Sequence, residues 1–159
     1  MQQTKPEVEN WYQTPDPWEY QIKHDDIYRK QQILDFLPQT YDRVLDIGCG
    51  EGWITQDLPG KELHGIEWSD TAASRFPSNV NRVLAPEGKY DLVTTQGTLY
   101  TQYNHKQIAE WIKDSSTKHI LVCGIEDWLL PYSFGTVIKE TKFPYRDWYQ
   151  LFKLYEVNQ

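Results

Sequence analysis

The segment Val44–Trp53, VLDIGCGEGW, constrains the fold more than any other part of this chain. An apolar run ends at Ile47, and Gly48, Gly50 and Gly52 follow at alternate positions, which predicts a buried strand that runs into a turn. Glycine permits positive φ, and its missing Cβ lets a ligand approach the backbone closely. In open α/β sheets, ligands bind beyond the carboxyl ends of the strands. The segment therefore predicts a ligand site at the end of a strand.

An acidic residue supports the same site. Leu63–Glu67 (LHGIE) has the pattern of a second strand, and Glu67 closes it. It follows the glycines by about 20 residues, where such folds place a carboxylate that accepts hydrogen bonds from ribose hydroxyls. The dinucleotide fingerprint G-x-G-x-x-G would need a glycine at position 53, where this chain has Trp53, and the Lys-Ser/Thr pair of a P-loop is absent. The pattern thus favours a nucleoside ligand, with a nicotinamide oxidoreductase as the less favoured reading.

Strand-like and helix-like segments alternate over most of the chain. We expect strands at Arg43–Ile47, Leu63–Glu67, Val80–Leu84, Asp91–Thr95 and Lys118–Ile125, and helices at Gln21–Leu37, Trp53–Leu58, Ser69–Phe76 and His105–Lys113. The alternation predicts a compact α/β domain with a mostly parallel sheet covered on both faces. Two further strands, Val137–Lys142 and Gln150–Val157, should form an antiparallel edge, with a helical turn at Tyr145–Trp148.

Two of the segments carry more specific expectations. In Gln21–Leu37, the residues Ile27, Leu34 and Leu37 share one helical face and should be its buried side. Over Trp11–Tyr20, two prolines forbid a regular helix and predict an ordered turn segment.

Length and charge limit the classes of function. A chain of 159 residues suits one domain. Its 16 Lys and Arg against 23 Asp and Glu argue against nucleic-acid binding, which needs a basic face. No apolar run approaches the ~20 residues of a membrane span, and Met1–Asn10 is polar, without a signal-peptide core. Cys49 and Cys123 suit a reducing compartment as free thiols. We expect a cytoplasmic protein with neither nucleic-acid nor membrane partners.

The glycine segment and three later ones resemble a known family. DIGCGEG, at Asp46–Gly52, resembles motif I of the class I S-adenosylmethionine-dependent methyltransferases. The second motif, the fourth-strand motif and the fifth strand of that family resemble GIEWSDTA (Gly65–Ala72), YDLVTTQGTLY (Tyr90–Tyr100) and HILVCGI (His119–Ile125). The first twenty residues, DPWEY above all, are more loosely similar to small N-methyltransferases of the nodulation-protein-S type.

The resemblance implies one methyltransferase domain over residues 1–159, with a Rossmann-like three-layer sandwich. Residues 1–40 would form an aromatic cap and a helix, residues 41–125 the cofactor-binding core, and residues 126–159 the strands on the substrate side. The cofactor would be S-adenosylmethionine, with S-adenosylhomocysteine as its product.

The resemblance also implies roles for residues. Asp46, Gly48 and Gly50 would hold the methionyl end of the cofactor, Glu67 its ribose hydroxyls, and Trp68 would pack beside the adenine. The other cofactor-binding positions are Cys49, Gly52 and Trp53 in the loop and Thr95, Gln96 and Gly97 near the sulfonium. In the family, an acidic residue after the third strand contacts the adenine amine, whereas Asn79–Gly88 offers only Glu87. Either Asn81 or a backbone group serves here, or packing holds the adenine.

The chemistry leaves the catalytic residues open. Methyl transfer from a sulfonium is an in-line displacement that depends on orientation and exclusion of water. A base is needed only if the acceptor must lose a proton, and the candidates that could orient or deprotonate it are Tyr12, His24, Tyr100, His105, Glu126 and Asp127. The four histidines lack metal-ligand spacing, so no metal is expected. We expect a small-molecule N or O acceptor. A nucleoside-binding module without turnover is the alternative.

Aromatic residues concentrate at both ends of the chain. Seven Trp, eleven Tyr and five Phe make 14% of it, and more than half of these rings lie in Met1–Tyr20 and Trp128–Gln159. Ring faces attract cations such as a sulfonium or an amine. Trp11, Trp18, Tyr20 and Trp128 are therefore candidates for the substrate side, together with Tyr132 and Phe134, although the N-terminal rings could equally serve only to cover the sheet. The oligomeric state stays open.

Overall fold

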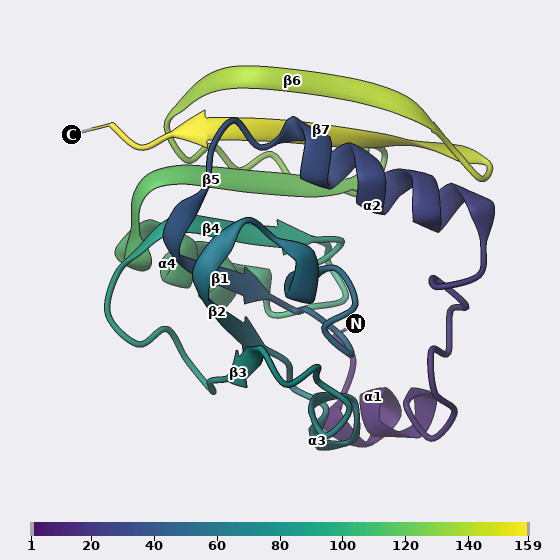
Figure 1. The fold of residues 1–159 in the computed structure, drawn as a ribbon. Helices are drawn as coiled ribbons and strands as arrows, with labels where there is room; N and C mark the ends of the chain where they lie inside the picture. Colours follow the sequence, from purple (N-terminus) through teal and green to yellow (C-terminus); the bar gives the residue numbers. More distant parts are fainter. Residues whose placement is uncertain (1, 159) are drawn as a thin grey trace.

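A computed structural model describes residues 2–158, which form one seven-stranded sheet (Figure 1). The strand order is β3-β2-β1-β4-β5-β7-β6. The strands are β1 (Tyr41–Ile47), β2 (Gly60–Ile66), β3 (Val80–Arg82), β4 (Tyr90–Gln96), β5 (Ser116–Ile125), β6 (Thr136–Tyr145) and β7 (Trp148–Glu156). Strands β1 to β5 pair in parallel, whereas β7 is antiparallel to both β5 and β6. The predicted parallel sheet with an antiparallel C-terminal edge is confirmed.

Helices α2 (His24–Phe36) and α4 (His105–Ser115) cover opposite faces of this sheet. The other helices, α1 (Lys5–Trp11) and α3 (Asp70–Ala73), pack on one another, and Thr55–Asp57 forms a 3-10 turn, η1. Consecutive residues of β1 face opposite ways, so Val44 joins the core with Ile33 of α2, and Leu45 joins the core with Ile112 of α4. The result is the expected Rossmann-like three-layer α/β sandwich. None of the helices in residues 2–158 is long and apolar enough to cross a membrane.

Two expectations about local structure are wrong, and one helix is additional. Trp53–Leu58 forms only the turn η1, because Pro59 leaves too few residues to nucleate an α-helix. Tyr145 and Trp148 pair directly across a two-residue hairpin turn instead of forming a helical turn. Helix α1 was not expected. Its only buried residue is Val8, so it carries no apolar periodicity.

Helix α2 lies where expected, and its expected face turns inward only in part. Leu34 and Leu37 are partly buried against the core, as expected, whereas Ile27 is half exposed. The buried residues of the helix are Asp26, Arg29, Ile33 and Phe36. The helix therefore buries two charged residues at its N-terminal half. Its other end packs as ordinary apolar core.

The N-terminal segment lies along the carboxyl edge of the parallel strands. Figure 1 shows the chain between α1 and α2 passing the end of the sheet at which β1 and β4 finish. The backbone N–H of Asp16 donates to the Glu51 carboxylate at 2.8 Å, and that of Gln3 donates to the carbonyl of Gln102 at 2.9 Å. The segment is thereby tied to the chain that follows β1 and to the chain that follows β4.

Candidate cofactor and acceptor site

The glycine loop after β1 has a backbone that requires glycine. The φ angles of Gly48, Gly50 and Gly52 are 74°, 60° and 79°. A Cβ on Gly48 would lie 2.5 Å from Cγ2 of Thr98. The N–H of Gly48 donates to the carbonyl of Ile66 at 2.8 Å, which ties the loop to the end of β2. The loop is thus fixed in a conformation that a side chain at position 48 would disturb.

Replacing Gly48 with alanine is expected to lower the free energy of unfolding by about 1–3 kcal/mol, because positive φ and the contact with Thr98 both oppose a Cβ. Gly88→Ala is the matched control. Gly88 also has positive φ, but its Cβ would meet only the end of the Arg43 side chain at 3.4 Å. Urea unfolding of both variants measures the difference. Equal losses would show that the crowding at Gly48 costs nothing.

Glu67 lies beyond the end of β2 and faces the loop. Its side chain is buried, and its two oxygens accept hydrogen bonds from the N–H of Gly50 at 2.8 Å and of Ser69 at 2.9 Å. Burial raises the pKa of Glu67, while these two donors oppose the rise. A carboxylate has about four lone-pair sites, so it can accept further hydrogen bonds from a ligand.

Asp46, in β1, is the second carboxylate at this edge. It is buried, and the Thr55 hydroxyl donates to its Oδ2 at 2.7 Å. Burial raises the pKa of Asp46 to about 7, and the Thr55 hydrogen bond offsets only part of that rise. An ammonium group placed beside Asp46 would favour its charged form.

The end of β4 meets the glycine loop. The Thr95 hydroxyl donates to the carbonyl of Ile47 at 3.0 Å and also contacts the Thr98 hydroxyl, so the Thr95 side chain joins β4 to β1. Gly97 has a φ of 68° and donates its N–H to the carbonyl of Cys123 at 2.9 Å. Gln96, at the end of the strand, is half-buried. What this edge offers a ligand is therefore mainly Gln96 and the backbone at Gly97.

Three other residues expected at the cofactor differ in their surroundings. Burial raises the pKa of the Cys49 thiol, which argues against a nucleophile. The Trp53 ring packs against the core under α2, with the Lys30 ammonium 4.5 Å from its centroid. Trp68 follows Glu67 and is 51% exposed, so its ring is free to cover a ligand.

The segment after β3 supplies no obvious carboxylate for an adenine. Glu87 lies at the opposite edge of the sheet, where its carbonyl accepts a hydrogen bond from Arg43 at 2.8 Å. Asn81 donates to the carbonyl of Leu63 at 3.3 Å, within the sheet. Of the alternatives weighed above, a backbone group or packing fits these positions best.

Tyr12 occupies the space over the glycine loop. Its side chain is buried, and its hydroxyl lies 3.1 Å from the position that a Cβ on Gly50 would take. Val8 and Ala72 form a small core with Tyr12, and Trp18 packs against it. The Trp18 ring also stacks on Tyr20, with centroids 5.8 Å apart. The N-terminal rings therefore reach from the glycine loop towards α2.

A second group of rings gathers beyond the ends of β4 and β5. The Tyr100 hydroxyl accepts a hydrogen bond from the N–H of Ile125 at 2.7 Å. Trp128 meets Tyr100 edge-on at 5.8 Å and Trp148 at 4.9 Å. Trp128 is 43% exposed, so this group borders solvent. Trp148 was not singled out from the sequence.

The remaining catalytic candidates are spread over the surface. His105 bonds through Nδ1 to the Tyr132 hydroxyl at 2.6 Å, and Glu126 pairs with Lys142 at 3.4 Å. His24 and Asp127 are exposed. Tyr100 is the only one of the six candidates that is both buried and in contact with Trp128.

Sequence reasoning missed a buried charged cluster at the start of α2. Asp26 is fully buried, and its carboxylate accepts hydrogen bonds from the Tyr145 hydroxyl at 2.5 Å and from Arg146 at 2.7 Å. Arg29 lies 3.6 Å from the same carboxylate. The available signal was that Asp26 and Arg29 share a helical face with Ile33, because residues three and four apart lie together.

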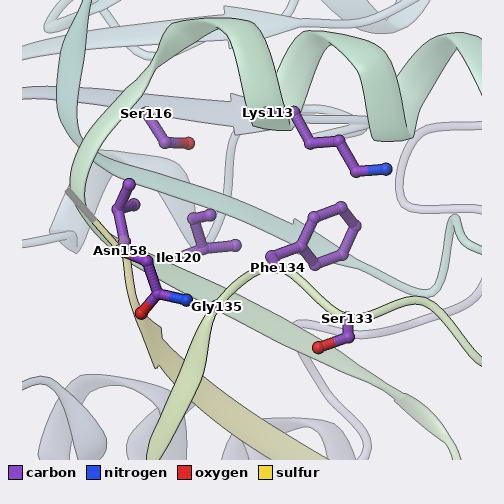
Figure 2. A pocket seen from close by; sticks show the side chains of 8 residues that line it. Lys113, Ser116, Ile120, Ser133, Phe134, Gly135 and Asn158 are labelled. Atoms are coloured by element: carbon purple, nitrogen blue, oxygen red, sulfur yellow. The ribbon is translucent and has the colours of Figure 1, made fainter.

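A pocket of about 240 Å³ lies at the other edge of the sheet, at the start of β5 (Figure 2). Its lining includes Lys113, Ser116, Phe134 and Asn158, and none of the expected cofactor residues. Phe134, a candidate for the substrate side, thus lines a pocket away from the glycine loop. Among residues 2–158, no three His, Cys, Asp or Glu side chains gather as a metal ion would require.

Comparison with known proteins gives structural neighbours only. No protein-family model matches the chain, and no curated protein matches it in sequence. The N-methyltransferase NodS from Bradyrhizobium japonicum WM9 aligns with a TM-score of 0.67 at 14% identity, covering 87% of this chain and 99% of that one. Magnesium protoporphyrin IX methyltransferase (ChlM) from Synechocystis PCC 6803, solved with bound SAH, gives 0.66 at 12%, covering 98% and 100%. TrmK from M. capricolum, in complex with S-adenosyl-homocysteine, gives 0.59 at 12%, covering 83% and 69%. The chain shares the fold of these methyltransferases.

Proposed function

We propose that this protein is an S-adenosylmethionine-dependent methyltransferase. One observation carries the proposal: the buried carboxylate of Glu67 is hydrogen-bonded to Gly50, in the middle of the positive-φ loop. A carboxylate that can accept hydrogen bonds from ribose hydroxyls thus lies beside the glycine loop at the carboxyl edge of the sheet. The similarity in fold to methyltransferases solved with S-adenosylhomocysteine supports the same ligand.

The residues present fit this cofactor chemically. Glu67 has lone pairs left for the ribose hydroxyls. Asp46 has a pKa of about 7, so a nearby ammonium group would convert it to its charged form and pair with it. The half-exposed Trp68 ring can cover an adenine. Because Tyr12 lies over Gly50, the cofactor would have to displace its side chain or lie beside it.

When bound, S-adenosylmethionine would supply an electrophilic methyl group. The chain's own residues then bind, orient and exclude water, which is what an in-line displacement needs most. Asp46 and the glycine loop would hold the methionyl end, while Thr95 keeps β4 beside β1. Tyr100 and Trp128 would line the part of the site that binds the acceptor. An unprotonated amine acceptor needs no base before transfer, whereas a hydroxyl acceptor would have to lose its proton. No residue is assigned as that base.

We further propose that the acceptor is a small molecule, methylated on nitrogen or oxygen. Most residues packed around Tyr100 are aromatic, and ring faces attract cations such as the protonated form of an amine. The acidic net charge of −7 disfavours RNA.

Calorimetric titration with S-adenosylmethionine tests the cofactor assignment. Glu67→Ala is expected to weaken binding about 10–100-fold, because hydrogen bonds to a charged group contribute about 1.5–3 kcal/mol. Glu62→Ala, which removes an exposed carboxylate of the preceding strand β2, is the matched control and should bind normally. Equal affinity in wild type and Glu67→Ala would contradict the assignment. A melting temperature raised by NADH but not by S-adenosylmethionine would favour an oxidoreductase.

A further inference from the structure

Arg29 is a buried cation on the acceptor side of the sheet. It shares the buried face of α2 with Ile33 and Phe36, which pack over β7 residues such as Phe152. Only 7% of Arg29 is exposed. The rings of Tyr20 and Tyr145 lie 5.3 Å and 5.9 Å from its guanidinium carbon.

The nearest carboxylate pairs with this cation without a hydrogen bond to its Nε. Asp26 Oδ1 is 3.6 Å from Arg29 Nε, beyond hydrogen-bond distance, and within residues 2–158 this Nε has no hydrogen-bond partner. Asp26 also binds Arg146 at 2.7 Å, so two guanidinium groups share one buried carboxylate. A buried charge without a full partner is costly, which makes the site favourable for an added anion.

Arg29 contacts both groups of rings. Its guanidinium faces Tyr20, which stacks on Trp18 in the N-terminal group, and it also faces Tyr145. Tyr145, which it faces, packs with Tyr100 and Ile125. A ligand group at Arg29 would therefore lie next to the group of rings assigned to the acceptor.

A second unpaired polar atom lies on the same face. Gln150, in β7, is 5% exposed, and its Oε1 has no hydrogen-bond partner among the described residues. It points to the same side of β7 as Phe152 and Leu154, because alternate residues of a strand share a face. The side of the sheet under α2 thus holds an unused donor on Arg29 and an unused acceptor on Gln150.

We propose that Arg29 binds a carboxylate of the methyl acceptor, and that the substrates are small anionic molecules which also carry an N–H or O–H donor for Gln150. This inference rests on the proposed function. The planar guanidinium matches a carboxylate with two parallel hydrogen bonds, which a lysine ammonium cannot reproduce. The methionyl carboxylate of the cofactor has the same chemistry, and the test separates the two sources.

The test compares carboxylates with their neutral amides as probes. Benzoate, 4-aminobenzoate and indole-3-acetate are each titrated against the corresponding amide, with and without S-adenosylhomocysteine, into wild type, Arg29→Met, Arg29→Lys and the control Lys113→Met. Lys113 is an exposed cation of the distant pocket, so its loss matches the change in net charge. The ratio of affinities within each variant is insensitive to a general loss of stability.

We expect wild type and Lys113→Met to bind at least one carboxylate about 10-fold or more tightly than its amide. The ratio should fall to about one in Arg29→Met and be intermediate in Arg29→Lys. The proposal is overturned if no pair shows a preference, or if the preference survives in Arg29→Met. It is also overturned if Arg29→Met loses affinity for S-adenosylhomocysteine and keeps the ratio, because Arg29 would then bind the cofactor's carboxylate. Failure of the proposed function is distinct: wild type would bind no S-adenosylhomocysteine, whatever the ratios.

Discussion

Asparagine at position 46 is expected to raise the free energy of unfolding at pH 8 by about 2–4 kcal/mol, because it removes a carboxylate whose pKa is about 7 in the fold against an ordinary value of 3.8. Between these two pKa values, the folded state keeps a proton that the unfolded state releases. The contribution of Asp46 to stability is therefore greatest below pH 4 and falls as the pH rises to 7. The amide also preserves an oxygen for the Thr55 hydroxyl.

Urea unfolding at pH 4 and pH 8 measures this effect. The gain of Asp46→Asn over wild type should be large at pH 8 and small at pH 4. Asp42→Asn, at an exposed carboxylate of the same strand, is the control and should show no such pH dependence. A gain that is equal at both pH values would contradict the buried, proton-binding state of Asp46.

The same substitution should weaken S-adenosylmethionine binding about 10–100-fold, since the amide cannot pair with an ammonium group. The single substitution Asp46→Asn would then both raise stability and weaken binding. This is the pattern expected where a site retains a buried charge for its ligand rather than for the fold. Calorimetry on the two proteins at pH 8 checks it, and unchanged affinity would remove Asp46 from the proposed site.

Alanine at position 26 is expected to cost about 3–5 kcal/mol of stability, because it leaves Arg29 buried without its nearest carboxylate. The Tyr145 hydroxyl and Arg146 lose their acceptor at the same time. Asp25→Ala is the matched control, since Asp25 accepts only a 3.2 Å hydrogen bond from the backbone of Arg146 at the exposed end of the helix. The Asp25→Ala variant should lose less than about 1 kcal/mol of its free energy of unfolding.

Urea or thermal unfolding at pH 7 compares the two variants. A loss below about 1 kcal/mol in Asp26→Ala would mean that water reaches the cluster and that Arg29 is not a desolvated cation. The carboxylate proposal would then lose its electrostatic basis. A loss of the expected size would support the buried charge, while leaving the identity of its ligand to the titrations.

Much of the fold could be predicted from sequence because its signals are local. The apolar run before Gly48 and the alternation of segments predict a mostly parallel sheet, although they do not give the order of its strands. The short helices were less predictable. Helix α1 buries only Val8, and the segment after Trp53 is cut by Pro59, so neither gives a reliable period. The segment after Trp53 fails to form an α-helix because it is too short before Pro59, and not because its residues disfavour a helix.

The arrangement of the candidate site could be predicted only where its residues lie close in sequence or at a known spacing. Glu67 and the glycine loop meet as expected. The charged cluster could not be inferred, because Asp26 acquires its partners Tyr145 and Arg146 from a hairpin more than a hundred residues later. For the same reason, the expected burial of Ile27 in α2 is wrong, whereas Leu34 and Leu37 pack partly against the core. Long-range pairing decides which side of an ambiguous helix is buried.

The central claim is tested most directly by transfer of a labelled methyl group. Wild-type protein is incubated with methyl-labelled S-adenosylmethionine and a metabolite extract, and the labelled products are identified by mass. The account predicts a small labelled product that Glu67→Ala fails to form and Glu62→Ala still forms. Tight binding of the cofactor with no labelled product from any extract would contradict it, and would leave a nucleoside-binding module in place of an enzyme.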